Sequence, residues 1–134
     1  MDLRGSGKIS VTHFSDVLRL ELLTARGGTW IDSTVYCTSP EMLNDVTSSA
    51  PLFAYRAVRA DNVSKYATYD NWLLYASVPS RILEDLRRML HEYWRREETL
   101  QHYFIFQILM NLACERHRDE ESLITTFSSE PCHV

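Results

Sequence analysis

The chain has 134 residues, of which 45% are hydrophobic and 24% are charged, and its formal net charge is −4. This composition is typical of one soluble globular domain and excludes a disordered chain, because enough apolar side chains are present to offset chain entropy. The negative charge argues against a nucleic-acid-binding protein, which usually presents a strongly basic face. The three cysteines form no CxxC pair, so neither a disulfide framework nor a four-ligand zinc site is expected.

The sequence contains no segment typical of secretion or of membrane insertion. The first ten residues hold Arg4 and Lys8 among glycines and lack an apolar core. The most apolar run, Tyr103 to Cys114, is 12 residues long, against the ~20 residues that cross a bilayer. We therefore predict a cytoplasmic protein without a transmembrane segment.

The first part of the chain predicts a helix followed by a strand. Residues 1–12 form a polar lead-in, and the apolar spacing from Phe14 to Arg26 predicts a helix. Ser15 is the expected N-cap, and Gly27-Gly28 is the expected stop in left-handed conformation. Thr29 to Thr38 is rich in β-branched and aromatic residues and predicts a strand.

The middle of the chain gives weaker signals. Pro51 to Val58 is a second strand candidate, and the polar stretch from Arg59 to Asn71 predicts a loop. The apolar run from Trp72 to Val78 fits either a strand or a helix.

The last part of the chain predicts two helices and a loose tail. Ser80 caps a helix whose apolar face is made by Ile82, Leu83, Leu86, Met89, Leu90, Tyr93 and Trp94. A second helix over 100–116 is apolar nearly all round and should be buried, whereas residues 118–134 are polar. We therefore expect residues 1–134 to form a single domain of the α/β class, with a mixed sheet and packed helices.

Two charged residues stand out on the first predicted helix. Asp16 and Arg19 are spaced i, i+3 and share a side of a helix that is otherwise largely apolar. Because unpaired burial of a charge costs several kcal/mol, both need partners. They either form a structural ion pair with each other or point toward a ligand.

Asp32 and Thr34 are the second pair of interest. Two residues apart on a strand, they would project to the same face, although Asp is disfavoured inside strands. A carboxylate and a hydroxyl at a strand end suit Mn²⁺ or Mg²⁺ together with a diphosphate. The alternative is an Asp that turns the chain or caps a neighbouring element.

These residues belong to a longer pattern. It consists of Gly7-Lys8-Ile9-Ser10, Phe14-Ser15-Asp16-x-x-Arg19, Leu22-Leu23, Gly27-Gly28-x-Trp30-Ile31-Asp32-x-Thr34, Asn71-Trp72, Tyr93-Trp94 and His102-Tyr103-Phe104. The pattern resembles the capsular polysaccharide synthesis family of glycosyltransferases, which is related to sugar transferases with a DxD motif and to the catalytic domains of large clostridial glucosylating toxins. The resemblance extends from about Lys8 to Leu112.

The resemblance implies a nucleotide-sugar-dependent transferase with a GT-A-like fold, of which this chain would be the central and C-terminal part. Asp16 would then bind hydroxyls of the donor, and Arg19 would lie near its sugar and diphosphate. Asp32 matches the first acid of the DxD-like motif, so it would hold the donor and a metal, and Thr34 stands where the toxin relatives carry the second acid. Asp32 and Arg19 are the expected catalytic residues, and Trp30 is an expected substrate contact.

The implied partners are a nucleotide-sugar donor and a glycan or lipid-linked acceptor at the inner face of the membrane. The basic residues Arg87, Arg88, Arg95 and Arg96 alternate with acids, which is typical of a solvated helix face, although such residues also suit anionic lipid. Two alternatives remain: an inactive transferase remnant that still binds nucleotide, and a non-catalytic interaction module that uses the apolar face of residues 82–94. The module predicts that Asp16 and Arg19 pair only with each other and that no cavity opens beside Asp32.

Overall fold

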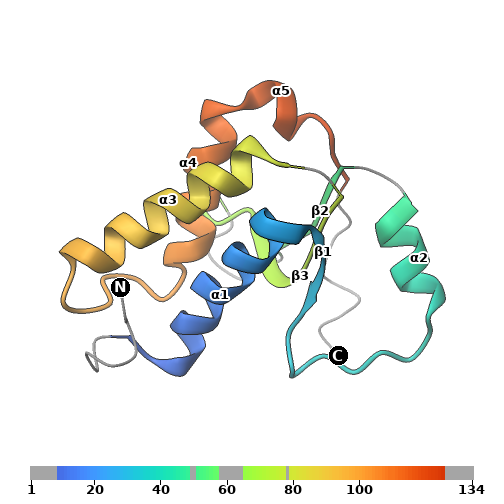
Figure 1. Cartoon of the computed structure of the whole chain (residues 1–134), viewed down its shortest axis with the longest axis horizontal. Helices are drawn as coiled ribbons and strands as arrows, with labels where there is room; N and C mark the ends of the chain where they lie inside the picture. Colours follow the sequence, from blue (N-terminus) through green and yellow to red (C-terminus); the bar gives the residue numbers. More distant parts are fainter. Residues whose placement is uncertain (1–8, 49–50, 58–64, 78, 126–134) are drawn as a thin grey trace.

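The computed structural model describes residues 9–48, 51–57, 65–77 and 79–125 (Figure 1). Its elements in chain order are α1 (Val11–Arg26), β1 (Gly28–Ile31), α2 (Glu41–Ser48), β2 (Leu52–Arg56), β3 (Tyr69–Ala76), α3 (Arg81–Arg96), α4 (Ile105–Arg116), α5 (Arg118–Glu121) and β4 (Ile124–Thr125). No helix in this described part combines the length and apolar character needed to cross a bilayer.

The strands form one sheet in the order β1-β3-β2-β4. Strand β3 is antiparallel to both β1 and β2, and its Leu74 lies opposite Trp30 on one side and Ala54 on the other. Strand β4 pairs with β2 in parallel. This mixed sheet with its packed helices confirms the predicted α/β class.

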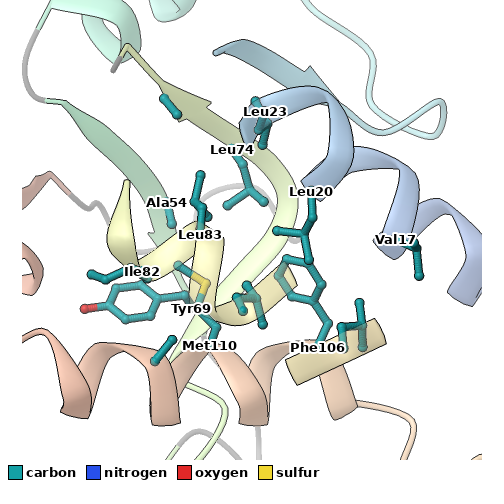
Figure 2. Packing of buried hydrophobic residues seen from close by; sticks show 14 of the residues in the cluster. Val17, Leu20, Leu23, Ala54, Tyr69, Leu74, Ile82, Leu83, Phe106 and Met110 are labelled. Atoms are coloured by element: carbon teal, nitrogen blue, oxygen red, sulfur yellow. The ribbon is translucent and has the colours of Figure 1, made fainter. Parts of the chain in front are cut away.

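Helices cover both faces of the sheet. The larger core lies between the sheet and helices α1, α3 and α4, and Figure 2 shows Leu20 of α1 and Phe106 of α4 pointing toward one another within it. Each fully buried Leu contributes about 1.5–3 kcal/mol relative to an exposed one. A smaller cluster on the other face joins Val46 of α2 to Phe53 and Leu73. Helix α3, together with the sheet and α4, therefore holds α1 in a fixed position.

Helix α1 begins three residues earlier than predicted. Ser10 is its N-cap, and the Ser10 Oγ accepts a hydrogen bond from the His13 backbone N–H at 3.2 Å. Ser15, the predicted cap, lies inside the helix and donates from Oγ to the Thr12 carbonyl at 2.6 Å. Both serines precede helix-forming residues. The earlier one is used because the additional turn buries the His13 ring, 6.2 Å from the ring of Trp94.

The glycine stop after α1 is confirmed, but the strand that follows is shorter than predicted. Gly27 and Gly28 have φ values of +68° and +101°. Strand β1 then ends at Ile31 instead of Thr38. The Asp32 N–H still donates to the Trp72 carbonyl at 2.8 Å, after which a Val35 N–H bond to the Asp32 carbonyl at 3.0 Å turns the chain away.

The rest of the sheet agrees with one strand prediction and resolves the ambiguous run. Strand β2 lies within the predicted residues 51–58, and the run from Trp72 belongs to β3. Strand β3 begins at Tyr69, inside the predicted loop, because the Ala57 N–H already donates to the Thr68 carbonyl at 2.8 Å. Residues 59–64 of that loop lie outside the described residues, and helix α2 was not predicted.

Helix α3 confirms its prediction, whereas α4 is shorter than expected. Ser80 caps α3 by accepting from the Leu83 N–H at 3.1 Å. Helix α4 begins at Ile105 and not at residue 100. The preceding backbone binds side chains instead of forming helical bonds: the Gln101 N–H donates to the Tyr93 hydroxyl at 2.7 Å, and the Phe104 N–H donates to Nδ1 of His102 at 3.0 Å.

The segment after His117 is folded over residues 118–125, where a loose tail was predicted. Helix α5 and strand β4 lie there, and residues 126–134 are outside the described residues. Glu120 of α5 reaches the beginning of α3, where one oxygen accepts from the Ser80 hydroxyl and the other from the Arg81 N–H at 3.0 Å. The sequence gives no sign of this contact, because the two partners are about forty residues apart.

The outer surface of α3 is balanced in charge. Arg87 pairs with Glu84 and Glu21, Arg88 with Asp85, and both Arg95 and Arg96 with Glu92. These pairs agree with the interpretation of a solvated helix face. Cys37 and Cys114 are free thiols, and Cys132 lies outside the described residues.

Candidate functional site

Asp16 and Arg19 lie on the side of α1 that faces β3 and α4. The residues are 7% and 2% exposed, although both are charged. Their i, i+3 spacing places them next to each other on one helix face, and Nη2 of Arg19 is 3.1 Å from Oδ1 of Asp16. The predicted proximity of this pair is therefore present in the structure.

Asp32 joins the pair from the end of β1. The same Nη2 of Arg19 lies 3.3 Å from Oδ1 of Asp32, whose side chain is 31% exposed. The hydrogen bond from the Asp32 N–H to Trp72 extends the β1–β3 pairing by one residue and fixes this carboxylate beside α1. Arg19 therefore contacts both carboxylates.

The other donors of Arg19 are directed at protein oxygens. Nε donates to the Ser15 carbonyl at 3.2 Å, Nη2 donates to the Ser15 Oγ at 3.0 Å, and Nη1 donates to the Asn71 carbonyl. The guanidinium also lies 4.9 Å from the centroid of Trp30 and 5.7 Å from that of Phe106. These contacts fix its position, so Arg19 sets the separation of the two acids.

A cavity of about 100 Å³ opens beside these groups. Asp16, Arg19, Asp32 and Asn71 line it, and Asn71 Nδ2 donates to Oδ1 of Asp16 at 3.0 Å. Tyr103, in the connection before α4, and Gln107, in the first turn of α4, also line it. The cavity is thus lined by residues of α1, the sheet and α4, and α1 and α4 are far apart in the sequence.

The electrostatics of the cavity are dominated by burial. Burial raises the pKa of Asp16 from 3.8 to about 6, against the opposing effects of Arg19 and His13, while the nearby Asp32 raises it further. Burial also lowers the pKa of Arg19, and the two carboxylates oppose this. An arginine with two acidic neighbours remains charged at neutral pH, so Asp16 is the group of this pair that titrates near pH 6.

The sequence as a whole matches a known family. A model of capsular polysaccharide synthesis proteins matches residues 2–134. The chain belongs to this family. No curated protein and no solved structure matches it significantly.

Two of the residues expected from the family pattern lie away from the cavity lining. Trp30 stands behind Asp32, and its Nε1 donates to Oδ1 of Asp32 at 3.1 Å, so it supports that acid. Thr34 is exposed in the turn that follows β1. The prediction that Thr34 and Asp32 share a strand face is therefore wrong, because β1 ends before both residues.

The expected pair of metal ligands, Asp32 and Thr34, is not formed in this chain. Oδ1 of Asp32 is directed at the donors of Arg19 and Trp30, and Thr34 lies in the exposed turn. Within the described residues, no group of three or more His, Cys, Asp or Glu side chains lies close enough together to hold a metal ion by itself. We derive no chemical step from an Mn²⁺ or Mg²⁺ ion.

Several cavity residues received no role from the sequence. Asn71 and Tyr103 are part of the family-like pattern, and that was the only signal for them. His13 also lines the cavity, where its Nε2–H donates to the Tyr103 carbonyl at 3.4 Å. Gln107 had no signal, because one polar residue in an apolar helix does not indicate which surface it faces.

The structure differs from both geometric expectations of the non-catalytic interaction module. Arg19 pairs with Asp32 as well as with Asp16. A cavity also opens beside Asp32.

Proposed function

We propose that this protein binds a nucleotide sugar at the Asp16–Arg19–Asp32 cavity and transfers the sugar to a glycan or lipid-linked acceptor. Membership of a capsular polysaccharide synthesis family supports a role in surface glycan assembly. We place this reaction in the cytoplasm, at the inner face of the membrane. The observation that carries the proposal is the contact of one buried guanidinium with two carboxylates on a shared cavity.

The carboxylates suit the sugar end of a donor. Ionised carboxylates only accept hydrogen bonds, and sugar hydroxyls can donate to them. Such contacts would orient the anomeric carbon for attack by an acceptor hydroxyl. Arg19 would hold the acids at a fixed separation and offset their charge, since its donors are directed at the protein.

The size of the cavity supports the same assignment. Its volume of about 100 Å³ is below the ~300–1,000 Å³ of sites that enclose a whole small molecule. We infer that the cavity receives the sugar and that the nucleotide lies outside it. Asp32, the more exposed acid, would then be closest to the sugar–diphosphate bond.

Thermal unfolding in the presence of donors tests the proposal. The wild-type protein is titrated with UDP-glucose, GDP-mannose and CDP-glucose, each with and without Mn²⁺, and sugar transfer and hydrolysis are measured in parallel. We expect at least one nucleotide sugar to raise the Tm, because a ligand that binds only the folded state stabilises it. The Mn²⁺ arm tests the metal requirement separately.

Matched variants identify the binding site. Asp16→Asn and Asp32→Asn should reduce the ligand-induced rise in Tm. Asp85→Asn is the control, because Asp85 is also a buried, ion-paired aspartate but contacts His117 and Arg88 on the α3–α4 side. A Tm unchanged by every nucleotide sugar would refute the proposal and favour the interaction module, whereas binding without transfer or hydrolysis would favour an inactive remnant.

A further inference from the structure

Gln107 is a buried polar residue whose side-chain amide has no protein partner among the described residues. It is 7% exposed, lies in the first turn of α4 and lines the cavity. Within the described part of the chain, its side-chain amide makes no hydrogen bond. Buried polar groups in native proteins are usually paired, so an amide that faces a cavity without a protein partner is available to water or to a ligand there.

Asn111, one turn further along α4, provides an internal comparison. Its Oδ1 accepts from the Thr68 N–H at 3.2 Å, and its Nδ2 donates to the Thr68 hydroxyl at 2.9 Å. Among the described residues, the Asn111 amide therefore has hydrogen-bond partners for both its oxygen and its nitrogen, whereas the Gln107 amide has a partner for neither. The difference is that Gln107 faces the cavity, whereas Asn111 faces the chain just before β3.

The charges of the cavity restrict the chemistry of the partner. Two carboxylates line it, and the guanidinium of Arg19 is directed at them and at protein oxygens. An anionic group would therefore face an excess of negative charge. A hydroxyl both donates and accepts, and an amide offers one acceptor and two donors, so the two groups are complementary.

We propose that Gln107 binds a hydroxyl group of the donor sugar and selects neutral sugars over uronic acids. The inference rests on the proposed function, because it assigns a specificity-determining residue to the same cavity. Asp16 and Asp32 accept hydrogen bonds from sugar hydroxyls, and Gln107 provides the additional contact from α4.

The test compares Gln107→Met with wild type in two measurements. Without ligand, the variant should have an unchanged or higher Tm, since the replaced amide has no protein partner and the side chain keeps its approximate volume. Calorimetry then measures binding of UDP-glucose, GDP-mannose and CDP-glucose, each beside its nucleoside diphosphate. We expect affinity for the nucleotide sugar to fall about tenfold, and affinity for the diphosphate to stay within about twofold. Asn111→Leu should lower the Tm, because it breaks the contacts with Thr68.

Each alternative outcome has a separate meaning. A lower Tm for Gln107→Met would show a structural role and overturn the inference, and so would equal losses for the sugar and the diphosphate. Tighter wild-type binding of UDP-glucuronic acid than of UDP-glucose would overturn the preference for neutral sugars. If wild type binds a nucleotide sugar and Gln107→Met binds it equally well, this inference fails alone. If wild type binds none, the proposed function fails together with it.

Discussion

Nη2 of Arg19, on α1, lies 3.3 Å from Oδ1 of Asp32, the first residue after β1. The same nitrogen is 3.1 Å from Oδ1 of Asp16, and the Arg19 side chain is 3% exposed. A buried cation of this kind is compensated only while its partners are in place. The arrangement therefore couples the position of α1 to the end of β1 at the cavity.

The first prediction concerns the loss of this cation. Arg19→Met would leave Asp16 and Asp32 next to each other without the positive charge between them. Removing one partner of a buried ionic group typically costs about 3–5 kcal/mol. We expect a decrease of that size in the free energy of unfolding, measured by urea denaturation at pH 7.

Two further variants serve as comparisons for this experiment. Arg19→Lys should also be destabilised, because an ammonium cannot reproduce the planar fork that reaches Ser15, Asn71 and the acids. Arg95→Met removes an exposed arginine that pairs with Glu92 and should leave stability unchanged within error. Equal effects of Arg19→Met and Arg95→Met would contradict the role of Arg19 as the centre of the site.

The second prediction follows from the raised pKa of Asp16. Burial raises this pKa from 3.8 to about 6, so between pH 4 and 6 the folded state binds more protons than the unfolded state. The free energy of unfolding therefore decreases as the pH rises. The stabilisation that proton binding to Asp16 gives the folded state is complete below pH 4 and is lost as the pH rises through 6. Its size is on the order of 3 kcal/mol. Asp16→Asn should remove this decrease in the free energy of unfolding, which urea denaturation at several pH values between 4 and 7 would measure.

A control separates this effect from general acid titration. Asp119 is exposed, and its hydrogen bond with Arg81 lowers its pKa below the ordinary 3.8. Asp119→Asn should therefore change the slope of the stability profile only below about pH 4 and shift the profile by a constant amount above it. If wild type and Asp16→Asn give parallel profiles between pH 4 and 6, Asp16 does not titrate in that range.

The parts of the fold that were predictable have local causes. Helix α3 was located because its apolar positions recur at helical spacing and because Ser80 precedes them as a cap. The glycine stop after α1 was located because positive φ favours glycine. The beginning of α1 was not predictable, because Ser10 and Ser15 are both suitable N-caps in the sequence. The contact of His13 with Trp94 decides between them.

The candidate site was predictable only in part, for a similar reason. The proximity of Asp16 and Arg19 follows from helix geometry, whereas the approach of Asp32 depends on the pairing of β1 with β3. Asn71 and Gln107 reach the cavity from elements more than fifty residues after Asp16. Such contacts depend on how the helices pack on the sheet, and the spacing of apolar residues within one segment does not indicate this packing.

The third prediction tests the contact of α5 with α3. Glu120 accepts from the Arg81 N–H at 3.0 Å and from the Ser80 hydroxyl, and thereby places a negative charge at the beginning of α3. Glu120→Ala should lower the free energy of unfolding by about 1 kcal/mol, the usual effect of losing a cap. Asp119→Ala, which removes an exposed partner of Arg81, is the matched control and should have a smaller effect. Urea denaturation of both variants measures the difference, and equal losses would exclude a capping role for Glu120.

The fourth prediction concerns the connection between α1 and β1, which positions Asp32. Gly27 has φ +68° and ψ −162°, a region nearly restricted to glycine, and a Cβ at this position would lie 2.7 Å from the Ala76 carbonyl oxygen. Gly28 has φ +101°, but a Cβ there would meet no atom within 4 Å. Gly28→Ala should therefore cost only the backbone strain, about 1–3 kcal/mol. Gly27→Ala should cost more, because the Ala76 oxygen is backbone and its displacement would disturb the pairing of Gly28 with Ala76. The denaturation midpoints of the two variants show directly which variant is less stable. A Gly28→Ala protein less stable than Gly27→Ala would show that the β3 backbone yields at this contact.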